Sequence, residues 1–136
     1  MKTLVLYYSY SGHTRALAQT LAQRDGAAIA EIQAVKTQGK LLTYVRGGLA
    51  AIRYKPWPIR PLAVELTDYE AIHILSPVWA SHPAPPVIAA LQALPRGKTV
   101  SVTMVSGSGG SGCRDWTEAL LKEKGCTLKA FTDVKA

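Results

Sequence analysis

The feature that most limits how this chain can fold is an uninterrupted apolar run near its start, at residues 4–8. A strand with apolar side chains on both sides is buried on both faces, which is typical of inner strands of a parallel sheet. Turn residues follow at 9–13, and Leu17, Ala18 and Leu21 then recur at helical spacing in a helix expected from 14 to 24. Gly26 ends this helix. The start of the chain therefore predicts a strand, a loop and a helix in succession.

The same alternation of strand and helix continues to the end of the chain. We expect further strands at 28–32, 72–75, 99–105 and 126–134, and helices at 42–52, 85–94 and 115–124. Residues 55–61 contain three prolines and must be extended. Such alternation predicts a parallel α/β sheet with right-handed crossovers. A length of 136 residues without a visible linker predicts one domain, 1–136.

Composition narrows the environment and the ligands. The formal net charge is +7 and the sequence pI is about 9.6, which favours anionic ligands or partners. The two cysteines, Cys113 and Cys126, lack metal-type spacing and are expected to be reduced thiols. The sequence shows neither a secretory leader nor an apolar stretch of membrane-spanning length. We therefore expect a cytoplasmic protein with no membrane association.

The first loop, at 9–14, has the composition of a phosphate site. Ser9, Ser11 and Thr14 offer hydroxyls, Gly12 permits close backbone approach, and a helix N-terminus adds N–H groups and a positive dipole end. The alternative is an ordinary capped helix start. Three other motifs do not fit: the chain has no G-x-G-x-x-G, no complete P-loop, and no carboxylates in this loop to hold Mg²⁺.

Two further loops follow the third and fourth predicted strands. The second loop, 76–86, contains four prolines and places Trp79 at a strand end, where a stacked flat ligand would explain it. The alternative is that Trp79 folds onto the adjacent helix. The third loop, 106–112, consists only of serine and glycine and either brings backbone donors to a ligand or is a flexible connection. Since ligands of parallel α/β sheets bind beyond the carboxyl ends of the strands, the three loops are expected to form one site.

Together these loops resemble those of the flavodoxin family. Residues 5–21 match the family's signature of apolar residues, an aromatic, Ser or Thr, a small residue, Thr, Ala and an aliphatic at the right spacing. Residues 76–80, Ser-Pro-Val-Trp-Ala, look like the family's second flavin loop, and the third loop matches in position. The resemblance covers nearly the whole chain and is weakest at 36–61. It implies a three-layer flavodoxin-like α/β fold with a five-stranded parallel sheet in the order 2-1-3-4-5, lacking the fifth, C-terminal helix.

The resemblance also implies non-covalently bound FMN, which would carry the redox chemistry without a catalytic side chain. The residues implied are Ser9, Tyr10, Ser11, Gly12, His13 and Thr14 at the phosphate, Pro77, Val78, Trp79 and Ala80 along the isoalloxazine ring with Trp79 stacking, and Ser106, Gly107, Ser108 and Gly109 on its other side. His82 is a candidate hydrogen-bond donor near the flavin. The family's electron carriers are typically acidic, whereas this chain is basic. Two roles therefore stay open: a carrier that works with a redox partner protein, and a reductase that passes electrons from NAD(P)H to a quinone or another small acceptor.

Two alternatives come from other functional classes. One is a binding module that keeps the fold and has lost the cofactor. The other is a basic nucleic-acid-binding domain, because Tyr44, Tyr54 and Trp57 interleave with Lys and Arg between 36 and 60, as in single-strand binders. A buried helix with a solvated basic face explains these residues more simply, so nucleic acid is not the expected partner. The same basic residues could instead contact a nucleotide phosphate or an acidic protein.

Polar side chains alternate with apolar ones along the last two predicted strands. Thr99, Ser101 and Thr103 occupy one side of the fourth strand, and His73 interrupts the third. One sheet face near these strands should therefore lack a covering helix. By the same alternation Phe131 would be exposed on this face. This face is therefore expected to be either solvated or covered by a second subunit, and a homodimer is slightly favoured because an exposed Phe is better buried.

Overall fold

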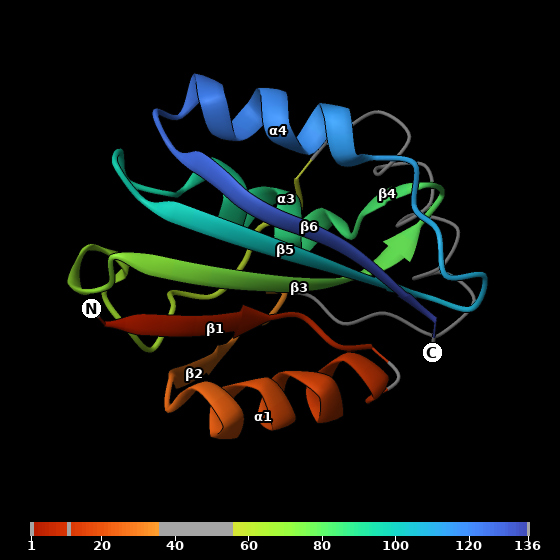
Figure 1. The fold of residues 1–136 in the computed structure, drawn as a ribbon, viewed down its shortest axis with the longest axis horizontal. Helices are drawn as coiled ribbons and strands as arrows, with labels where there is room; N and C mark the ends of the chain where they lie inside the picture. The colour runs from red at the N-terminus through yellow and green to blue at the C-terminus, as the bar shows by residue number, and fades with distance from the viewer. Residues whose placement is uncertain (1, 11, 36–55, 136) are drawn as a thin grey trace.

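The computed structural model describes residues 2–10, 12–35 and 56–135, which form one sheet between helices (Figure 1). Five strands run parallel in the order β2-β1-β3-β5-β6. They are β1 (Thr3–Tyr7), β2 (Ala28–Glu31), β3 (Ala71–Trp79), β5 (Thr99–Ser106) and β6 (Thr127–Lys135). Counted over the parallel strands, this is the predicted 2-1-3-4-5 order, so the predicted fold class is confirmed.

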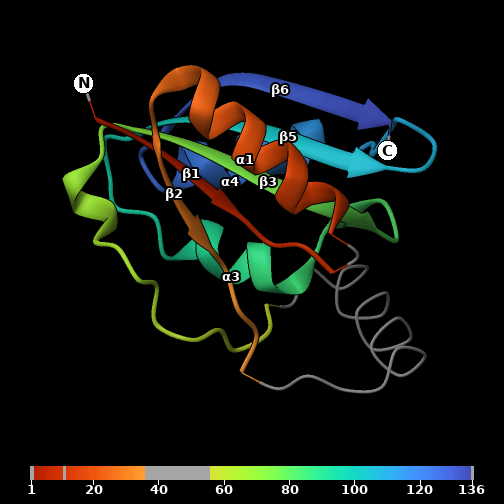
Figure 2. The same cartoon turned by 90° about the horizontal axis from the view of Figure 1, so that it is seen from below.

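Helices cover both faces of the sheet. One face carries α1 (His13–Asp25), and the opposite face carries α3 (Pro85–Gln92) and α4 (Arg114–Glu123), as Figures 1 and 2 show. A short 3-10 helix, η1 (Leu66–Asp68), precedes β3. The predicted helix at 42–52 lies outside the described residues. Among the helices that are described, none combines the length and apolarity needed to span a membrane.

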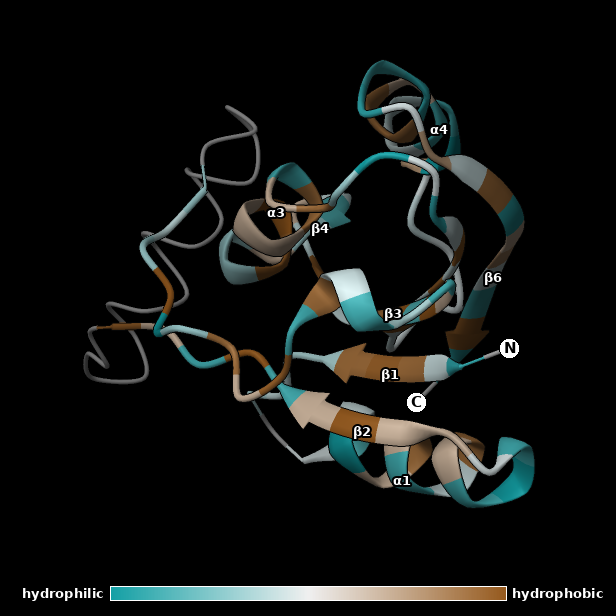
Figure 3. Cartoon of the chain, turned by 90° about the vertical axis from the view of Figure 1, so that its left-hand side faces the viewer, coloured by the Kyte–Doolittle hydropathy of each residue, from teal (hydrophilic) through white to brown (hydrophobic). Residues whose placement is uncertain are grey.

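The apolar run at the start of the chain is buried on both sides, as predicted. Leu4, Val5 and Leu6 are each 0% exposed. Leu4 and Leu6 pack in the core beneath α3 and α4, whereas Val5 packs with Ala18 and Ala22 of α1. In Figure 3 most of β1 has the brown of apolar residues, whereas brown and teal alternate along β6. Alternate residues of β1 therefore hold the two helical layers against one strand.

The predicted loop at 76–86 is wrong in its first half, because β3 continues to Trp79 and the chain returns as a hairpin. Strand β4 (His82–Pro83) pairs antiparallel with the end of β3. Ala80 and Ser81 between them have φ values of 53° and 64°, the left-handed pair of a type I′ turn. A two-residue edge strand tolerates Pro83, which cannot donate to a ladder. The prolines therefore delimit a hairpin here and do not exclude strand structure.

The prediction for Phe131 is also wrong, because β6 contains a bulge. Val100 pairs with Leu128, but the next residue of β5, Ser101, pairs with Ala130. Lys129 is therefore an extra residue in β6, and every later side chain of β6 points to the opposite face from that predicted. Phe131 pairs with Val102 and packs, half-buried, against the core under α3 and α4. The argument for a dimer that rested on an exposed Phe131 is thereby removed.

The predicted polar sheet face is present in part. Thr99 and Ser101 are half-buried on the α1 side of the sheet, beyond the end of that helix. Thr103, in contrast, is 4% exposed, and its Oγ1 lies 2.7 Å from His73 Nε2. The two polar side chains that seemed to interrupt apolar strands therefore satisfy each other across β3 and β5. The expected opening is limited to the part of the face nearer the amino ends of the strands.

Candidate functional site

The carboxyl ends of β1, β3 and β5 meet at one edge of the sheet, and the three predicted loops leave from that edge (Figure 1). The pairing explains this, since the end of β1 lies beside Leu75 of β3, and Pro77 of β3 lies beside Val105 of β5. The loop after β1, the hairpin after β3 and the loop after β5 are therefore brought together as predicted. Ser11, which was predicted to take part, lies outside the described residues.

The first loop leads into α1 through a left-handed glycine. Gly12 has φ 98° and ψ −15°, and a Cβ added there would have no heavy atom within 4 Å. Its N–H donates to Ser9 Oγ at 3.0 Å, and its carbonyl accepts the Ala16 N–H at 3.1 Å. No acidic residue occupies the first turn of α1, and the N-cap position has no side chain to cap it. Among the described residues, the N-terminus of α1 therefore has no side-chain cap at its N-cap and no acidic residue in its first turn, which leaves the positive end of the helix dipole available to an anion.

The two predicted residues at the start of α1 differ in exposure. His13 is exposed, whereas Thr14 is 3% exposed and faces the protein. Of these two predicted residues, only His13 has a largely accessible side chain. Tyr10, the remaining aromatic of this loop, is half-buried against the main core.

Trp79 lies at the centre of an aromatic cluster at the end of β3. Tyr8, Tyr10 and Trp57 each have a ring centroid 5.9 Å from that of Trp79, with interplanar angles of 84°, 87° and 66°. All three contacts are edge-to-face, an arrangement that aromatic rings prefer. Trp79 is only 7% exposed, so its ring is largely covered by its neighbours. Trp79 therefore packs among rings of the protein, and none of these three rings belongs to the adjacent helix α3 onto which the sequence alternative placed it.

Burial of this cluster affects the phenol of Tyr8. Desolvation, with smaller contributions from Tyr10 and Glu31, raises the pKa of Tyr8 to about 12. Tyr8 is therefore a neutral phenol at any physiological pH. The cluster offers apolar rings and neutral hydroxyls to a ligand and no negative charge.

The hairpin after β3 is fixed by a buried serine. Ser76 is 0% exposed, and its Oγ accepts the Ala84 N–H at 3.0 Å and donates to the Pro77 carbonyl at 2.8 Å. Pro77 and Val78 are half-buried, and Ala80 at the turn is exposed. Ser76 thus links the end of β3 to Ala84, the N-cap residue of α3. The predicted ring-lining residues lie in a hydrogen-bonded hairpin.

The third loop is held by its own serine hydroxyls. Ser106 Oγ accepts the Gly109 N–H at 2.9 Å, and Ser108 Oγ donates to the Gly110 carbonyl at 3.3 Å. Gly109 has φ 82°, and a Cβ there would come within 3.3 Å of the Lys135 Cβ, so this position requires glycine. Gly107 and Ser108 are exposed. The loop is therefore ordered internally while its outer surface stays accessible.

The structure adds two aromatic residues that the sequence reasoning did not place in this site. Trp57 reaches the cluster from the proline-rich stretch, where its backbone N–H donates to the Pro85 carbonyl at 3.3 Å. Trp116 of α4 lies 6.3 Å from His82, ring centroid to ring centroid, at an interplanar angle of 85°. His82 Nδ1 also lies 2.8 Å from the Ala80 carbonyl oxygen. Only tertiary packing brings these residues to the site, because neither belongs to one of the three loops that follow a strand.

Comparisons with known proteins give matches among solved structures. No protein-family model matches the sequence, and no curated protein matches it. A flavoprotein from Lactobacillus acidophilus, crystallised with FMN, is 24% identical with a TM-score of 0.72, over 96% of this chain and 91% of that chain. A Bacteroides uniformis protein assigned as a flavoprotein is 24% identical with a TM-score of 0.80, over 99% and 92% of the two chains. This chain has the flavodoxin-like fold.

A solved structure of lower sequence identity is also similar to this chain. Two-electron reduced flavodoxin from Megasphaera elsdenii is 16% identical with a TM-score of 0.60, over 97% of this chain and 85% of that chain. At such identities the likeness concerns the arrangement of the sheet and helices. In a flavodoxin-like sheet the edge at which the three loops meet lies outside the carboxyl ends of the strands, the usual ligand position in open α/β sheets.

Proposed function

We propose that this chain binds FMN non-covalently and transfers electrons through it. The observation that carries the proposal is the start of α1, where a left-handed Gly12 and uncapped N–H groups form an open cradle at the ligand-binding edge of a flavodoxin-like sheet. Backbone donors and the helix dipole favour a phosphate group there. Ser9 Oγ accepts from Gly12, so its own O–H proton is free to donate to that phosphate.

The surroundings of the cradle suit the remainder of a flavin. The half-buried rings of Tyr10 and Trp57 border Trp79, and the Ser106–Gly109 end of the third loop offers exposed backbone groups. The flavoprotein of Lactobacillus acidophilus, with the same fold, was crystallised with FMN. When bound, FMN would supply one- and two-electron redox chemistry. The chain would bind the phosphate, cover the ring and keep negative charge away from it.

Stacking of the ring on Trp79 remains part of this proposal, with a structural condition. Because three rings cover Trp79 edge-on, stacking requires Tyr10 or Trp57 to move aside when the flavin binds. The flavin should therefore change the tryptophan fluorescence, and Trp79→Phe should remove most of that change. If Trp57→Phe removes the change and Trp79→Phe does not, the stacking residue is Trp57.

The phosphate assignment is tested by titrating the purified protein with FMN and with riboflavin. Ser9→Ala, at the entry to α1, should weaken FMN binding by about 1.5–3 kcal/mol, the value of a hydrogen bond to a charged group, and leave riboflavin binding nearly unchanged. Thr20→Ala is the matched control, because Thr20 lies on the exposed side of the same helix and its hydroxyl donates to the Ala16 carbonyl. Equal affinity of the protein for FMN and riboflavin would exclude a phosphate site in this loop.

Within this proposal we favour a reductase over a carrier. The net charge of +7 differs from the acidic balance typical of flavodoxin carriers and attracts the phosphates of NAD(P)H. A reductase fed by NAD(P)H would work in the cytoplasm with a quinone or another small acceptor. Anaerobic titration of the FMN-loaded protein with NADH and NADPH tests this, since rapid bleaching of the flavin indicates a reductase. No bleaching, together with rapid reduction by a separate flavodoxin reductase, would instead indicate a carrier.

A further inference from the structure

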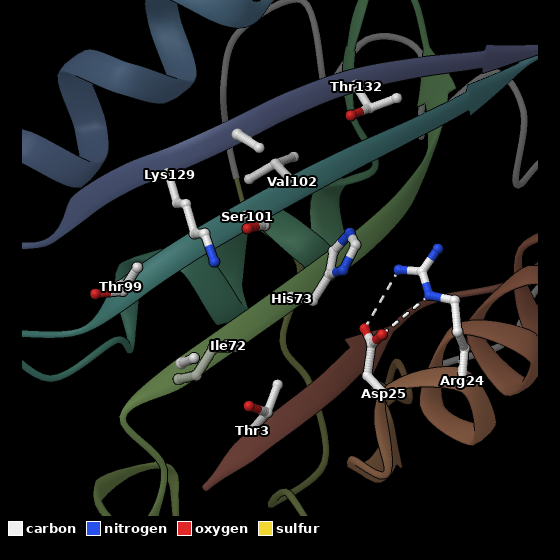
Figure 4. Close-up of a pocket in the computed structure, with 12 residues that line it drawn as sticks. Thr3, Arg24, Asp25, Ile72, His73, Thr99, Ser101, Val102, Lys129 and Thr132 are labelled. Carbon is white, nitrogen blue, oxygen red and sulfur yellow. Dashed lines mark hydrogen bonds and ion pairs between the residues drawn. The ribbon is translucent and has the colours of Figure 1, made fainter. Parts of the chain in front are cut away.

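A groove opens on the α1 side of the sheet, away from the candidate flavin site (Figure 4). It has a volume of about 470 Å³, within the range of small-molecule sites. Thr3, Ala71 and Thr99, which line it, are the first residues of β1, β3 and β5, and the last turn of α1 closes one side. We call it the amino-end groove. None of the residues predicted to bind FMN lines it.

Lys129, at the β6 bulge, supplies a cation to the groove. Lys129 is the residue that the bulge inserts. It lines the groove from β6, whereas Arg24 and Asp25 line it from α1. Figure 4 shows its side chain extending across the face of β5, toward the side of the groove where His73 lies. Without the extra residue, the β6 side chains that follow Lys129 would point to the opposite face.

Lys129 adds a positive charge to a groove whose lining carboxylate, Asp25, is paired with Arg24 and is also attracted to Lys129. Arg24 Nε donates to Asp25 Oδ1 at 2.9 Å, so these two side chains neutralise each other. His73 is tied to Thr103, and its burial lowers the pKa of its imidazole, which makes the ring neutral at pH 7. In the part of the chain that the structure describes, Lys129 forms no ion pair. The groove therefore carries a net positive charge.

Hydroxyl groups also line the groove. Thr3, Thr99 and Ser101 are half-buried in the groove, and Thr132 lies at its outer side. Within the described residues, none of these four hydroxyls forms a side-chain hydrogen bond to the protein. An ammonium group and hydroxyl groups can all donate hydrogen bonds to the oxygens of an oxyanion.

We propose that the amino-end groove binds a small oxyanion, a carboxylate- or phosphate-bearing metabolite, through Lys129 and the hydroxyls of Thr99 and Ser101. Asp25 at the rim would accept a hydrogen bond from a hydroxyl or amine elsewhere on the same molecule. The site is independent of the proposed flavin function, because it lies at the amino ends of the strands and shares no residue with the phosphate cradle.

The test is an amide NMR titration of ¹⁵N-labelled protein with citrate and, separately, with inorganic phosphate, at constant ionic strength set with chloride. Saturable shifts are expected at residues 71–73, 99–101 and 129–132, and the stronger of the two probes identifies the anionic group. Lys129→Gln should weaken the binding about fivefold, the equivalent of a partly screened charge contact. Lys122→Gln on the exposed side of α4 is the matched control and should change nothing.

Several outcomes would overturn the proposal. Shifts that rise linearly with anion concentration, or that are equal in wild type and Lys129→Gln, would mean only non-specific screening. Shifts of the same residues with protein concentration, without anion, would mean that a second copy of the chain occupies this face. Ser101→Ala gives a second variant that keeps all charges and should also weaken binding. The titration is repeated with and without FMN, so a failure of flavin binding would not be mistaken for failure of this site.

Discussion

The left-handed glycines at the two ends of α1 allow the phosphate cradle to be tested against a matched control. Gly12 begins the helix with φ 98°, and Gly26 ends it with φ 61°. At both positions a Cβ would have open space within 4 Å, so replacement by alanine adds backbone strain and no clash. An L-residue pays roughly 1–2 kcal/mol to remain left-handed, and both variants should lose stability of about this size.

Only Gly12→Ala should also weaken FMN binding. With open space around it, the alanine can relieve the strain by leaving the left-handed region, and the cradle must be restored when the phosphate binds. A cost of about 1–2 kcal/mol at that step corresponds to an affinity roughly five- to thirtyfold lower. Riboflavin has no phosphate, so its affinity should change little. Gly26 lies at the other end of the helix, and its alanine variant should bind both flavins normally.

Flavin fluorescence quenching measures these affinities, and urea unfolding followed by circular dichroism measures the stabilities. The informative quantity is the ratio of FMN to riboflavin affinity in each variant, because a general loss of stability cancels in it. An unchanged ratio in Gly12→Ala would refute the phosphate cradle. An equal fall of the ratio in Gly26→Ala would show that the helix as a whole, and not its first turn, controls binding.

Three further predictions concern pH, the hairpin and the potential. Burial lowers the pKa of His73 from the usual 6.5, so the unfolded chain binds the proton more readily, and stability should fall as pH drops below about 6.5. Urea unfolding at pH 7.5 and 5.5 measures this fall. The unfolding free energy should depend less on pH in His73→Gln than in the exposed-site control His13→Gln. Ser81→Gly should raise the unfolding free energy by about 1 kcal/mol, because glycine adopts the left-handed turn conformation without strain; a lower urea midpoint would contradict this. Residues 71–114 contain no Asp or Glu, so the last reduction step of bound FMN should have a less negative potential than in acidic flavodoxins, as a dye-equilibrium titration would show; a potential as low as theirs would refute the electrostatic argument.

The succession of strands and helices was predictable because the local signals were strong, whereas the strand order came from the resemblance to the flavodoxin family. A run such as 4–8 is apolar on both sides and can only be an inner strand, and right-handed crossovers then restrict how the following strands can be placed. Helix starts were predictable for a similar reason: Pro85 fits the first turn of α3, and Gly12 allows the sharp entry to α1. The edge at which the loops meet follows directly from that topology.

Two features escaped prediction because they depend on partners distant in sequence. Nothing near Lys129 marks it as a bulge, since the bulge is defined only by the register of β6 against β5. One inserted residue turns every later side chain of the strand to the other face of the sheet. Phe131 was therefore assigned to the wrong face. The hairpin at 79–82 was missed because Ala and Ser at its turn are not the glycine or asparagine that a type I′ turn favours.

The position of Trp79 shows why an aromatic at a strand end is ambiguous in sequence. Its spacing from the strand is the same whether the ring faces a ligand or neighbouring rings. The structure supplies three neighbours, and one of them, Trp57, comes from a proline-rich stretch whose path no local signal predicts. Edge-to-face contacts of this kind contribute about 0.5–1.5 kcal/mol per pair beyond burial. A flavin ring that displaces one of these contacts must therefore gain at least as much free energy from stacking on Trp79. A ligand that stacks more weakly would not displace the neighbouring ring.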